Sequence, residues 1–235
     1  MKRILIVEDE AAIREFEVIN LRRVGYQTVE ADCAEAALQI YDEDTEGFDI
    51  ALLDISMPGM DGFTLCKELR KRSTQLGIIM LTARTQEMDK ISGLMLGADD
   101  YITKPFSPTE LNARVDSLYR RVEMQAEKTE PVANEEIKIG EFVLNLRRRT
   151  LHKNNKNIEL TQVEFQLVEY FFANPDIALD RNDILNRVWG DSYFGEEKIV
   201  DVNIRRLRMK IEDEPSTPKY LITVWGMGYK WCSEV

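Results

Sequence analysis

The sequence predicts two folded domains in series: a doubly wound five-stranded parallel α/β sheet over residues 1–123 and an α+β domain over residues 137–235. Short apolar runs alternate with helix-forming segments through the first range, which is the pattern of βα units with short connections. The second range has short alternating segments, then helical segments and a final hairpin pattern. Residues 124–136 are acidic and carry no hydrophobic period, so we expect a linker there.

Five strands and five helices are expected in the first domain. Unbroken apolar runs are typical of strands that are buried on both faces of a parallel sheet. The expected strands are residues 4–7, 27–31, 50–53, 78–81 and 101–103. The expected helices are residues 10–24, with apolar spacing at Ile13, Phe16, Ile19 and Leu21, and residues 34–41, 62–72, 86–96 and 108–124. A strand order of 2-1-3-4-5 would set the first and third strands side by side.

The second domain is expected to begin with short strands between Ile137 and Leu160. A helix follows from about Thr161, and Asp180 is placed to cap a shorter one. A longer helix is expected at residues 196–212 and a hairpin at residues 220–231, where two glycines bracket the turn. The mixture of short strands and helices is typical of an α+β domain.

The net charge of −11 argues, for the chain as a whole, against binding to nucleic acid. Residues 1–123 carry 15 basic and 23 acidic side chains, and residues 124–136 carry one and four. Residues 137–235 carry 15 of each. The acidity therefore belongs to the first domain and the linker, and local clustering must decide what the second domain binds.

Three widely spaced cysteines favour neither a disulfide framework nor a zinc site. The apolar run near the start is too short for a signal peptide, and no stretch has the length of a membrane span. We therefore expect a cytoplasmic protein with reduced thiols and no membrane partner.

Four predicted strands end in residues that carry chemistry. Glu8 and Asp9 follow the first strand, Asp54 closes the third, Thr82 the fourth and Lys104 the fifth. Because the carboxyl ends of parallel strands meet at one edge of a sheet, these side chains are expected to lie together. Closely spaced carboxylates repel unless a cation intervenes, and Mg²⁺ characteristically takes one or two carboxylates together with phosphate and water oxygens.

This constellation resembles the receiver domain of two-component response regulators over residues 2–122, which has the flavodoxin-like fold. The resemblance implies that Asp54 is the phosphoryl acceptor and that Mg²⁺ binds Asp9, Asp54 and the backbone carbonyl of Ser56, with Glu8 in an outer position. It also implies that the phosphoryl group is bound and sensed by Thr82, Ala83, Tyr101 and Lys104, and that the Lys104–Pro105 peptide bond is cis.

The predicted helix at 108–124 shows a polar stripe formed by Glu110, Arg114, Ser117 and Arg121. This stripe is similar to the one used for symmetric receiver dimers in regulators of the OmpR/PhoB subfamily. The resemblance implies a homodimer that forms on phosphorylation, with Lys90 paired to Glu110, Asp100 to Arg114 and Asp99 to Arg121.

Residues 137–235 resemble the winged-helix DNA-binding domain of the same subfamily. Three stretches carry the resemblance: residues 160–165, 200–208 and 226–229. Within the recognition helix, Val200, Ile204, Leu207 and Ile211 have the spacing of a buried face. The helix period then turns Val202, Arg205, Arg206 and Met209 outward, where the valine and the arginines suit a major groove.

Further DNA contacts are expected at the edges of that face, mainly to phosphates. The residues are Lys198, Asn203, Arg208 and Lys230. The chain departs from subfamily members that place an arginine before the first glycine of the wing, because it has Trp225 there. We therefore expect little charge-based reading of the minor groove by the wing.

The sequence as a whole indicates a phosphorylation-controlled transcription regulator and not an enzyme in the ordinary sense. It has no phosphoryl source of its own, so the donor is expected to be a separate sensor histidine kinase. Promoter DNA with tandem half-sites is the expected target, and RNA polymerase is a further partner to consider. Two alternatives stay open: an aspartyl-phosphate phosphatase, disfavoured because Ser56 follows Asp54 at the second position, and a DNA-binding regulator that works without phosphorylation.

Overall fold

The computed structural model describes residues 2–83, 96–123, 136–191, 193 and 195–234. Contacts divide the chain into two compact units, Met1–Glu123 and Met124–Val235, and each is described here by itself. The expected linker falls outside the described residues except for Glu136, which is the first residue of a strand. Among the helices of the described part, none combines the length and the apolar character that a membrane crossing requires.

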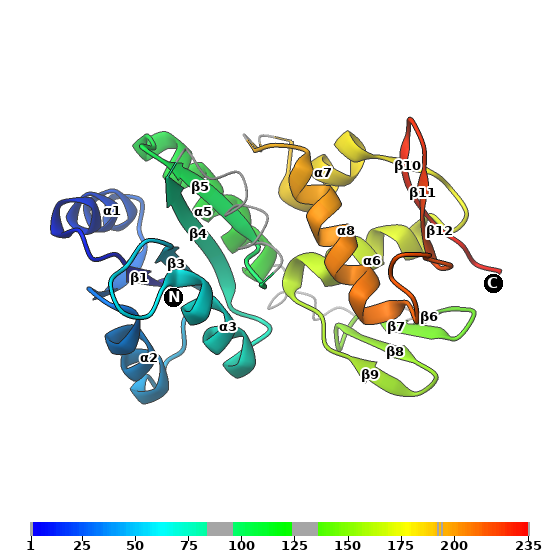
Figure 1. Cartoon of the computed structure of the whole chain (residues 1–235), viewed down its shortest axis with the longest axis horizontal. Coiled ribbons are helices and arrows are strands. Elements are labelled where there is room, and N and C mark those ends of the chain that lie inside the picture. Colours follow the sequence, from blue (N-terminus) through cyan, green and yellow to red (C-terminus); the bar gives the residue numbers. More distant parts are fainter. Residues whose placement is uncertain (1, 84–95, 124–135, 192, 194, 235) are drawn as a thin grey trace. The chain divides into compact units, whose positions relative to one another are not determined.

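The first unit is built on a five-stranded parallel sheet with the order β2-β1-β3-β4-β5, as predicted (Figure 1). Its strands are β1 (Arg3–Val7), β2 (Gln27–Ala31), β3 (Ile50–Asp54), β4 (Gly77–Ala83) and β5 (Asp100–Lys104). β1 and β3 are neighbours, with Val7 beside Leu53. Every residue of β3 is buried, which explains the unbroken apolar run that ends in Asp54.

Four helices of the first unit are described: α1 (Ala11–Arg23), α2 (Ala34–Glu43), α3 (Gly62–Arg72) and α5 (Pro108–Glu123). α1 contacts α5 and α2 contacts α3, so the helices form two layers with the sheet between them (Figure 1). The helix expected at residues 86–96 lies outside the described residues except for Leu96, which is in a turn.

The buried face of α1 differs from the predicted one. Ile19 was expected on the apolar face, but 57% of its surface is exposed. The helix buries Leu21, as predicted, together with Glu17 and Val18. A glutamate therefore occupies a position that the hydrophobic period did not assign to the core.

The described residues of the second unit form two antiparallel sheets and three helices (Figure 1). The first sheet has the order β6-β7-β8-β9, with β6 (Glu136–Ile139), β7 (Phe142–Asn145), β8 (Thr150–Lys153) and β9 (Lys156–Ile158). The second has the order β10-β12-β11, with β10 (Leu179–Asp180), β11 (Leu221–Val224) and β12 (Gly228–Trp231). The helices are α6 (Gln162–Ala173), α7 (Arg181–Trp189) and α8 (Lys198–Ile211).

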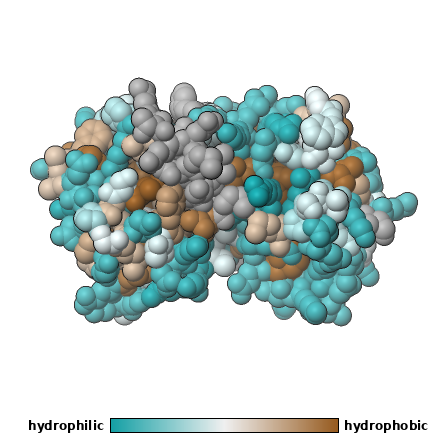
Figure 2. Space-filling model, viewed as in Figure 1, coloured by the Kyte–Doolittle hydropathy of each residue, from teal (hydrophilic) through white to brown (hydrophobic). Residues whose placement is uncertain are grey.

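Two helices of the second unit start where the sequence predicts. Thr161 caps α6 by accepting a hydrogen bond from the backbone N–H of Glu164, whose carboxylate in turn accepts from the backbone N–H of Thr161. Asp180 caps α7 through the backbone N–H of Asn182. On the face shown in Figure 2, hydrophilic side chains cover most of the described surface and hydrophobic ones form separate patches.

Candidate functional site

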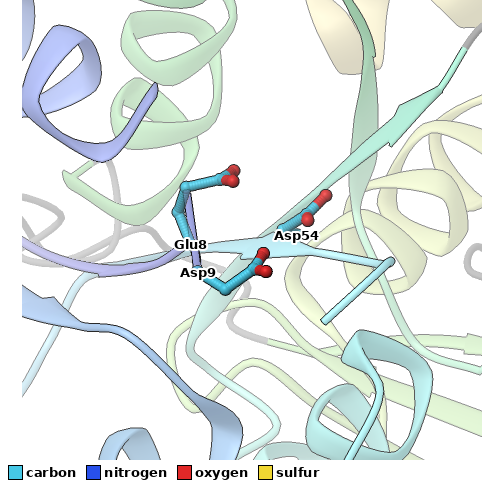
Figure 3. A group of neighbouring side chains, drawn as sticks. All are labelled: Glu8, Asp9 and Asp54. Atoms are coloured by element: carbon cyan, nitrogen blue, oxygen red, sulfur yellow. The ribbon is translucent and has the colours of Figure 1, made fainter. Parts of the chain in front are cut away.

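The predicted strand-end residues of the first unit gather at one edge of the sheet. Asp54 is the last residue of β3 and is 4% exposed, Lys104 is the last residue of β5, and Glu8 and Asp9 follow β1. Carboxylate oxygens of Glu8, Asp9 and Asp54, called the acidic cluster below, all lie within 4.8 Å of one another (Figure 3).

Lys104 joins two members of this cluster. Its Nζ lies 2.6 Å from a carboxylate oxygen of Glu8 and 2.9 Å from Oδ1 of Asp54. Burial alone would lower the pKa of the Lys104 ammonium, but its bonds to Glu8 and Asp54 hold that pKa above its ordinary value. A protonated lysine therefore lies beside Asp54 at neutral pH.

Glu8 is the inner member of the cluster. Its side chain is fully buried, and burial raises the pKa of its carboxyl even though the bond from Lys104 opposes the rise. Asp9 is partly exposed, and Ser56 is exposed in the loop that follows β3. The residues fit a hard divalent cation, because three carboxylates lie together, the Lys104 ammonium pairs with two of them, and Mg²⁺ prefers oxygen ligands.

Of the residues expected to sense a phosphoryl group, Thr82 and Ala83 are the last two of β4 at this edge of the sheet, and Tyr101 lies three residues before Lys104 on β5. Thr82 is 1% exposed, and its hydroxyl donates to the backbone carbonyl of Ala83 at 3.3 Å. Tyr101 is buried at 5% exposure. The Lys104–Pro105 peptide bond is cis, as predicted.

Two residues around the cluster were not singled out from the sequence. Glu17 is fully buried on α1, and burial together with the charge of Glu8 raises the pKa of its carboxyl to about 8. Gly62 begins α3 so close to Asp54 that a Cβ there would lie 2.1 Å from the Asp54 carbonyl oxygen. In the sequence, the only sign of this close packing was a glycine at the first position of the predicted helix. A glycine there can indicate that a neighbouring backbone leaves no space for a side chain.

The predicted dimer residues are paired within the chain. A guanidinium nitrogen of Arg114 lies 3.0 Å from Asp100 and another lies 3.3 Å from Glu110. Asp99 is fully buried, pairs with Arg70, and accepts a hydrogen bond from the backbone of β4. Lys90 and the side chain of Arg121 lie outside the described residues, so the predicted pairs between two copies remain predictions.

The buried face predicted for α8 is confirmed: Val200, Ile204, Leu207 and Ile211 are at most 1% exposed. The predicted outward face is only partly correct. Met209 is 60% exposed and Arg205 is exposed, but Val202 and Arg206 are each 6% exposed and Asn203 is fully buried. The expectation that Val202 and Arg206 face solvent is therefore wrong in this structure.

A buried carboxylate explains the position of Arg206. Glu164 is fully buried at the start of α6, and its oxygens lie 3.1 Å from Arg206 and 2.6 Å from Lys210. Burial favours the neutral acid, but these two cations hold the pKa of Glu164 below its ordinary value. Arg206 also donates to Asn203, whose amide donates to the carbonyl of Ile199.

The remaining residues predicted to contact DNA differ in their exposure. Lys198 is exposed at the start of α8, and Lys230 is partly exposed on β12. Arg208 donates to the carbonyl of Leu221 at 2.8 Å and to the hydroxyl of Thr223 at 2.9 Å, so it fastens α8 to β11.

Comparisons with known families identify both units. The model of the family described as "Response regulator receiver domain" matches residues 4–116, and that described as "Transcriptional regulatory protein, C terminal" matches residues 155–231. The chain belongs to the response regulators, with a receiver domain followed by a winged-helix DNA-binding domain of the OmpR/PhoB type.

Three solved structures illustrate the likeness. The Thermotoga maritima response regulator DrrB, an OmpR/PhoB homologue, is 28% identical over 99% of both chains, with a TM-score of 0.50. A CheY-like receiver domain protein from Methanospirillum hungatei JF-1 is 31% identical and matches 53% of this chain and 98% of its own, also at 0.50. A mutant of RitR, 24% identical over the whole of both chains with a TM-score of 0.77, shows the same fold.

These findings define a transcription regulator of a two-component system and not a classical enzyme. A histidine kinase and DNA are the partners of this pair of domains. Receiver domains typically bind Mg²⁺, and the acidic cluster is the group of residues in the described part of this chain that suits such an ion.

Proposed function

We propose that a histidine kinase transfers a phosphoryl group to Asp54, and that the modified receiver then dimerises so that the second domain binds promoter DNA. The observation that carries this proposal is the position of the Lys104 ammonium, 2.9 Å from Oδ1 of Asp54 at the rim of the acidic cluster. A buried carboxylate with a cation beside it is suited to attack a phosphoryl group, because the cation neutralises the negative charge on the transferring oxygens.

The transfer is a displacement at phosphorus. A carboxylate oxygen of Asp54 forms a bond to phosphorus, and the bond between phosphorus and the imidazole nitrogen of the donor breaks. Asp9, Asp54 and the Ser56 carbonyl would bind Mg²⁺ directly, and Glu8 would lie in the outer coordination shell of the ion. The bound Mg²⁺ would supply positive charge to neutralise the phosphoryl oxygens.

The chain's own residues stabilise the product. Lys104 pairs with a phosphoryl oxygen, and Glu8 keeps that ammonium in place through its 2.6 Å contact. The hydroxyl of Thr82, which donates to the Ala83 carbonyl at 3.3 Å, turns to donate to the phosphoryl group. Tyr101 would respond to that movement from the neighbouring strand β5.

Acetyl phosphate and Mg²⁺ test the acceptor directly. We expect the intact mass of the wild-type chain to increase by one phosphoryl group and that of Asp54→Asn to stay unchanged. Asp32→Asn is the matched control, because Asp32 is an exposed carboxylate directly after β2, which β1 separates from β3, and should leave labelling intact. Equal labelling of wild type and Asp54→Asn would reject Asp54 as the acceptor.

Dimerisation is the second part of the proposal. Arg114 already contacts Asp100 and Glu110 within one chain, so a symmetric dimer would exchange or extend these contacts through Asp99, Lys90 and Arg121. Because Arg114 and Asp100 are buried in the single chain, we expect such an exchange to set the register of the two copies. We expect sedimentation velocity to show dimers of the phosphorylated wild type and monomers of a phosphorylated Glu110→Lys variant.

Promoter binding is the third part. Exposed Arg205 and Lys198 support a surface on α8 that faces the phosphates and base edges of tandem half-sites. Contacts through Arg208 and Lys230 remain predictions, whereas Val202, Asn203 and Arg206 are buried in this structure. RNA polymerase would then be reached from the bound promoter, and we expect all of these events to take place in the cytoplasm.

Alanine variants of Arg205 and Arg206 test this surface. We expect Arg205→Ala to weaken footprints on a selected duplex while its unfolding curve stays that of the wild type, because Arg205 is exposed. Arg206→Ala should alter the unfolding curve as well, because it leaves Glu164 short of a partner. Wild-type footprints in the Arg205 variant would reject this assignment.

A further inference from the structure

Glu17 is a buried ionisable group that the proposed phosphoryl transfer does not use. It lies in the middle of α1, its side chain is fully buried, and neither of its carboxylate oxygens has a hydrogen-bond partner among the described residues. A polar group in such a place loses its hydration without gaining a hydrogen bond, which disfavours it relative to an apolar side chain of similar size. Packing therefore does not explain why a carboxyl lies here.

Two contacts place Glu17 beside the acidic cluster. Arg14, which is three residues before Glu17 and thus its neighbour on the surface of α1, donates from Nη1 to the backbone carbonyl of Glu8 at 2.6 Å. Phe16 packs against Phe106 with 6.1 Å between the ring centroids, and Phe106 lies two residues after the end of β5. Glu17 therefore lies on the part of α1 that contacts the segments following β1 and β5, which carry the cluster and its lysine.

The charges that act on Glu17 come from the same region. Burial is the main cause that favours its neutral form, and it raises the pKa of the carboxyl to about 8 together with the negative charges of Glu8 and Asp54. Lys104 and Arg14 oppose this rise. Because no hydrogen bond joins Glu17 to any of these groups within the described residues, the coupling acts through space, where a buried site screens charges weakly.

Acidic groups on the other elements that contact α1 are engaged elsewhere. Glu30 on β2 pairs with arginines of α1, and Asp116 on α5 accepts a hydrogen bond from the hydroxyl of Tyr26. Neither is among the charges that act most strongly on the Glu17 carboxyl. A change of charge at the acidic cluster is therefore the change to which Glu17 should respond most.

We propose that Glu17 couples Mg²⁺ binding by the receiver to pH: its carboxyl O–H bond breaks and the proton passes to solvent when the acidic cluster binds the ion. This inference rests on the proposed Mg²⁺-dependent function and adds its regulation by pH. Two positive charges added to the cluster offset the repulsion that favours the neutral form of Glu17. Because coupling between two binding events is reciprocal, ionised Glu17 strengthens Mg²⁺ binding, and the receiver binds the ion more tightly as pH rises.

Isothermal titration calorimetry of Mg²⁺ into the full-length chain tests the coupling. Titrations at pH 7 in two buffers with different ionisation enthalpies give the number of protons released per bound ion. We expect the wild type to release about half a proton to one proton more than Glu17→Gln, since a carboxyl with a pKa of about 8 is mostly neutral at pH 7. Release that remains in Glu17→Gln is expected from Glu8, because burial raises the pKa of that carboxyl as well.

The pH profile of the Mg²⁺ affinity separates a proton-linked role from a purely structural one. The affinity of the wild type divided by that of Glu17→Gln should be near one at low pH, where both side chains are neutral. It should increase roughly tenfold between about pH 6 and pH 8, within the limit of about tenfold per pH unit that the release of one proton sets. Glu15→Gln changes an exposed side chain of the same helix and should match the wild type at every pH.

The outcomes are distinct. Equal proton release by the wild type and Glu17→Gln, or a ratio of affinities that is constant with pH, would overturn this inference while labelling of Asp54 by acetyl phosphate and Mg²⁺ still supports the proposed function. If the wild-type chain neither binds Mg²⁺ nor is labelled, both proposals fail.

Discussion

Replacing Glu17 by glutamine should make the stability of the receiver domain less sensitive to pH. Glu17 is fully buried on α1, and neither of its carboxylate oxygens has a hydrogen-bond partner among the described residues. Burial is the main cause that raises the pKa of its carboxyl from 4.5 to about 8, and the charges of Glu8 and Asp54 add to it. The folded domain therefore holds the Glu17 proton at pH values where the unfolded chain has lost it.

The sign and the size follow from this difference in pKa. Because the folded state binds more protons than the unfolded state between pH 4.5 and about 8, stability is greatest below that window and falls as pH rises through it. At about 1.4 kcal/mol per pKa unit, the loss is about 3 kcal/mol at pH 7 and approaches about 5 kcal/mol above pH 8. Glu17→Gln cannot ionise, so its advantage over the wild type should grow with pH by the same amount.

Pulsed hydrogen exchange after equilibration in urea measures this for the receiver alone, through peptides from β1 and β3. The free energy of unfolding of Glu17→Gln minus that of the wild type should rise by about 1.4 kcal/mol per pH unit between about pH 5 and pH 8, with EDTA present. The control is Glu15→Gln, which changes an exposed side chain of the same helix and should give a flat difference. Mg²⁺ should move the window to lower pH, because it offsets the charges of Glu8 and Asp54.

A difference that is constant with pH would refute the reasoning, since it would show that Glu17 is not a neutral acid in the folded state. A pH window that Mg²⁺ does not move would leave burial as a cause of the raised pKa but remove the coupling to the acidic cluster.

Three further substitutions have expected outcomes that the structure fixes. Gly62→Ala should abolish labelling by acetyl phosphate, because a Cβ 2.1 Å from the Asp54 carbonyl must displace the acceptor; labelling at the wild-type rate would contradict this. Arg206→Ala should lower the free energy of unfolding of the second domain by about 3 kcal/mol, because it removes a partner of the buried Glu164. Tryptophan fluorescence during urea unfolding measures this change. A change near zero would show that the pair with Glu164 is dispensable. Thr161→Ala should cost about 1 kcal/mol by removing the cap of α6, and the same assay detects it.

The acidic cluster could be predicted from sequence because its geometry follows from local patterns. Each strand is a short apolar run, and parallel strands deliver their last residues to one edge of the sheet. Once β1, β3 and β5 are assigned, the residue that ends each strand is fixed within one position. The sequence predicted that Glu8, Asp54 and Lys104 lie together, and the contacts of Lys104 with Glu8 at 2.6 Å and with Asp54 at 2.9 Å come from the structure.

The side-chain directions on helices could not be predicted in the same way. A hydrophobic period assigns apolar residues to the inside and charged ones to the outside. It therefore placed Ile19 inside, although this residue is 57% exposed, and it left out Glu17, which is fully buried. It also turned Arg206 outward, although its guanidinium lies 3.1 Å from a carboxylate on another helix.

The errors share a physical cause, which is that a charged group can be buried when something neutralises it. Glu164 is neutralised by Arg206 and Lys210, and the carboxyl of Glu17 by a proton. The cations that pair with Glu164 and the groups that raise the pKa of Glu17 come mostly from other parts of the sequence. The pattern of a single helix therefore cannot reveal either of them.

The distinction matters for the proposed contact between α8 and DNA. Arg205 and Arg206 are neighbours in the sequence and look equally suited to a groove, yet only Arg205 is exposed. Loss of a buried pair acts on stability, whereas loss of an exposed cation acts on binding and its salt dependence. If Arg206→Ala changed the salt slope of binding and left stability unaltered, Arg206 would have to leave Glu164 on the promoter. That result would turn the buried pair from a structural contact into a part of recognition.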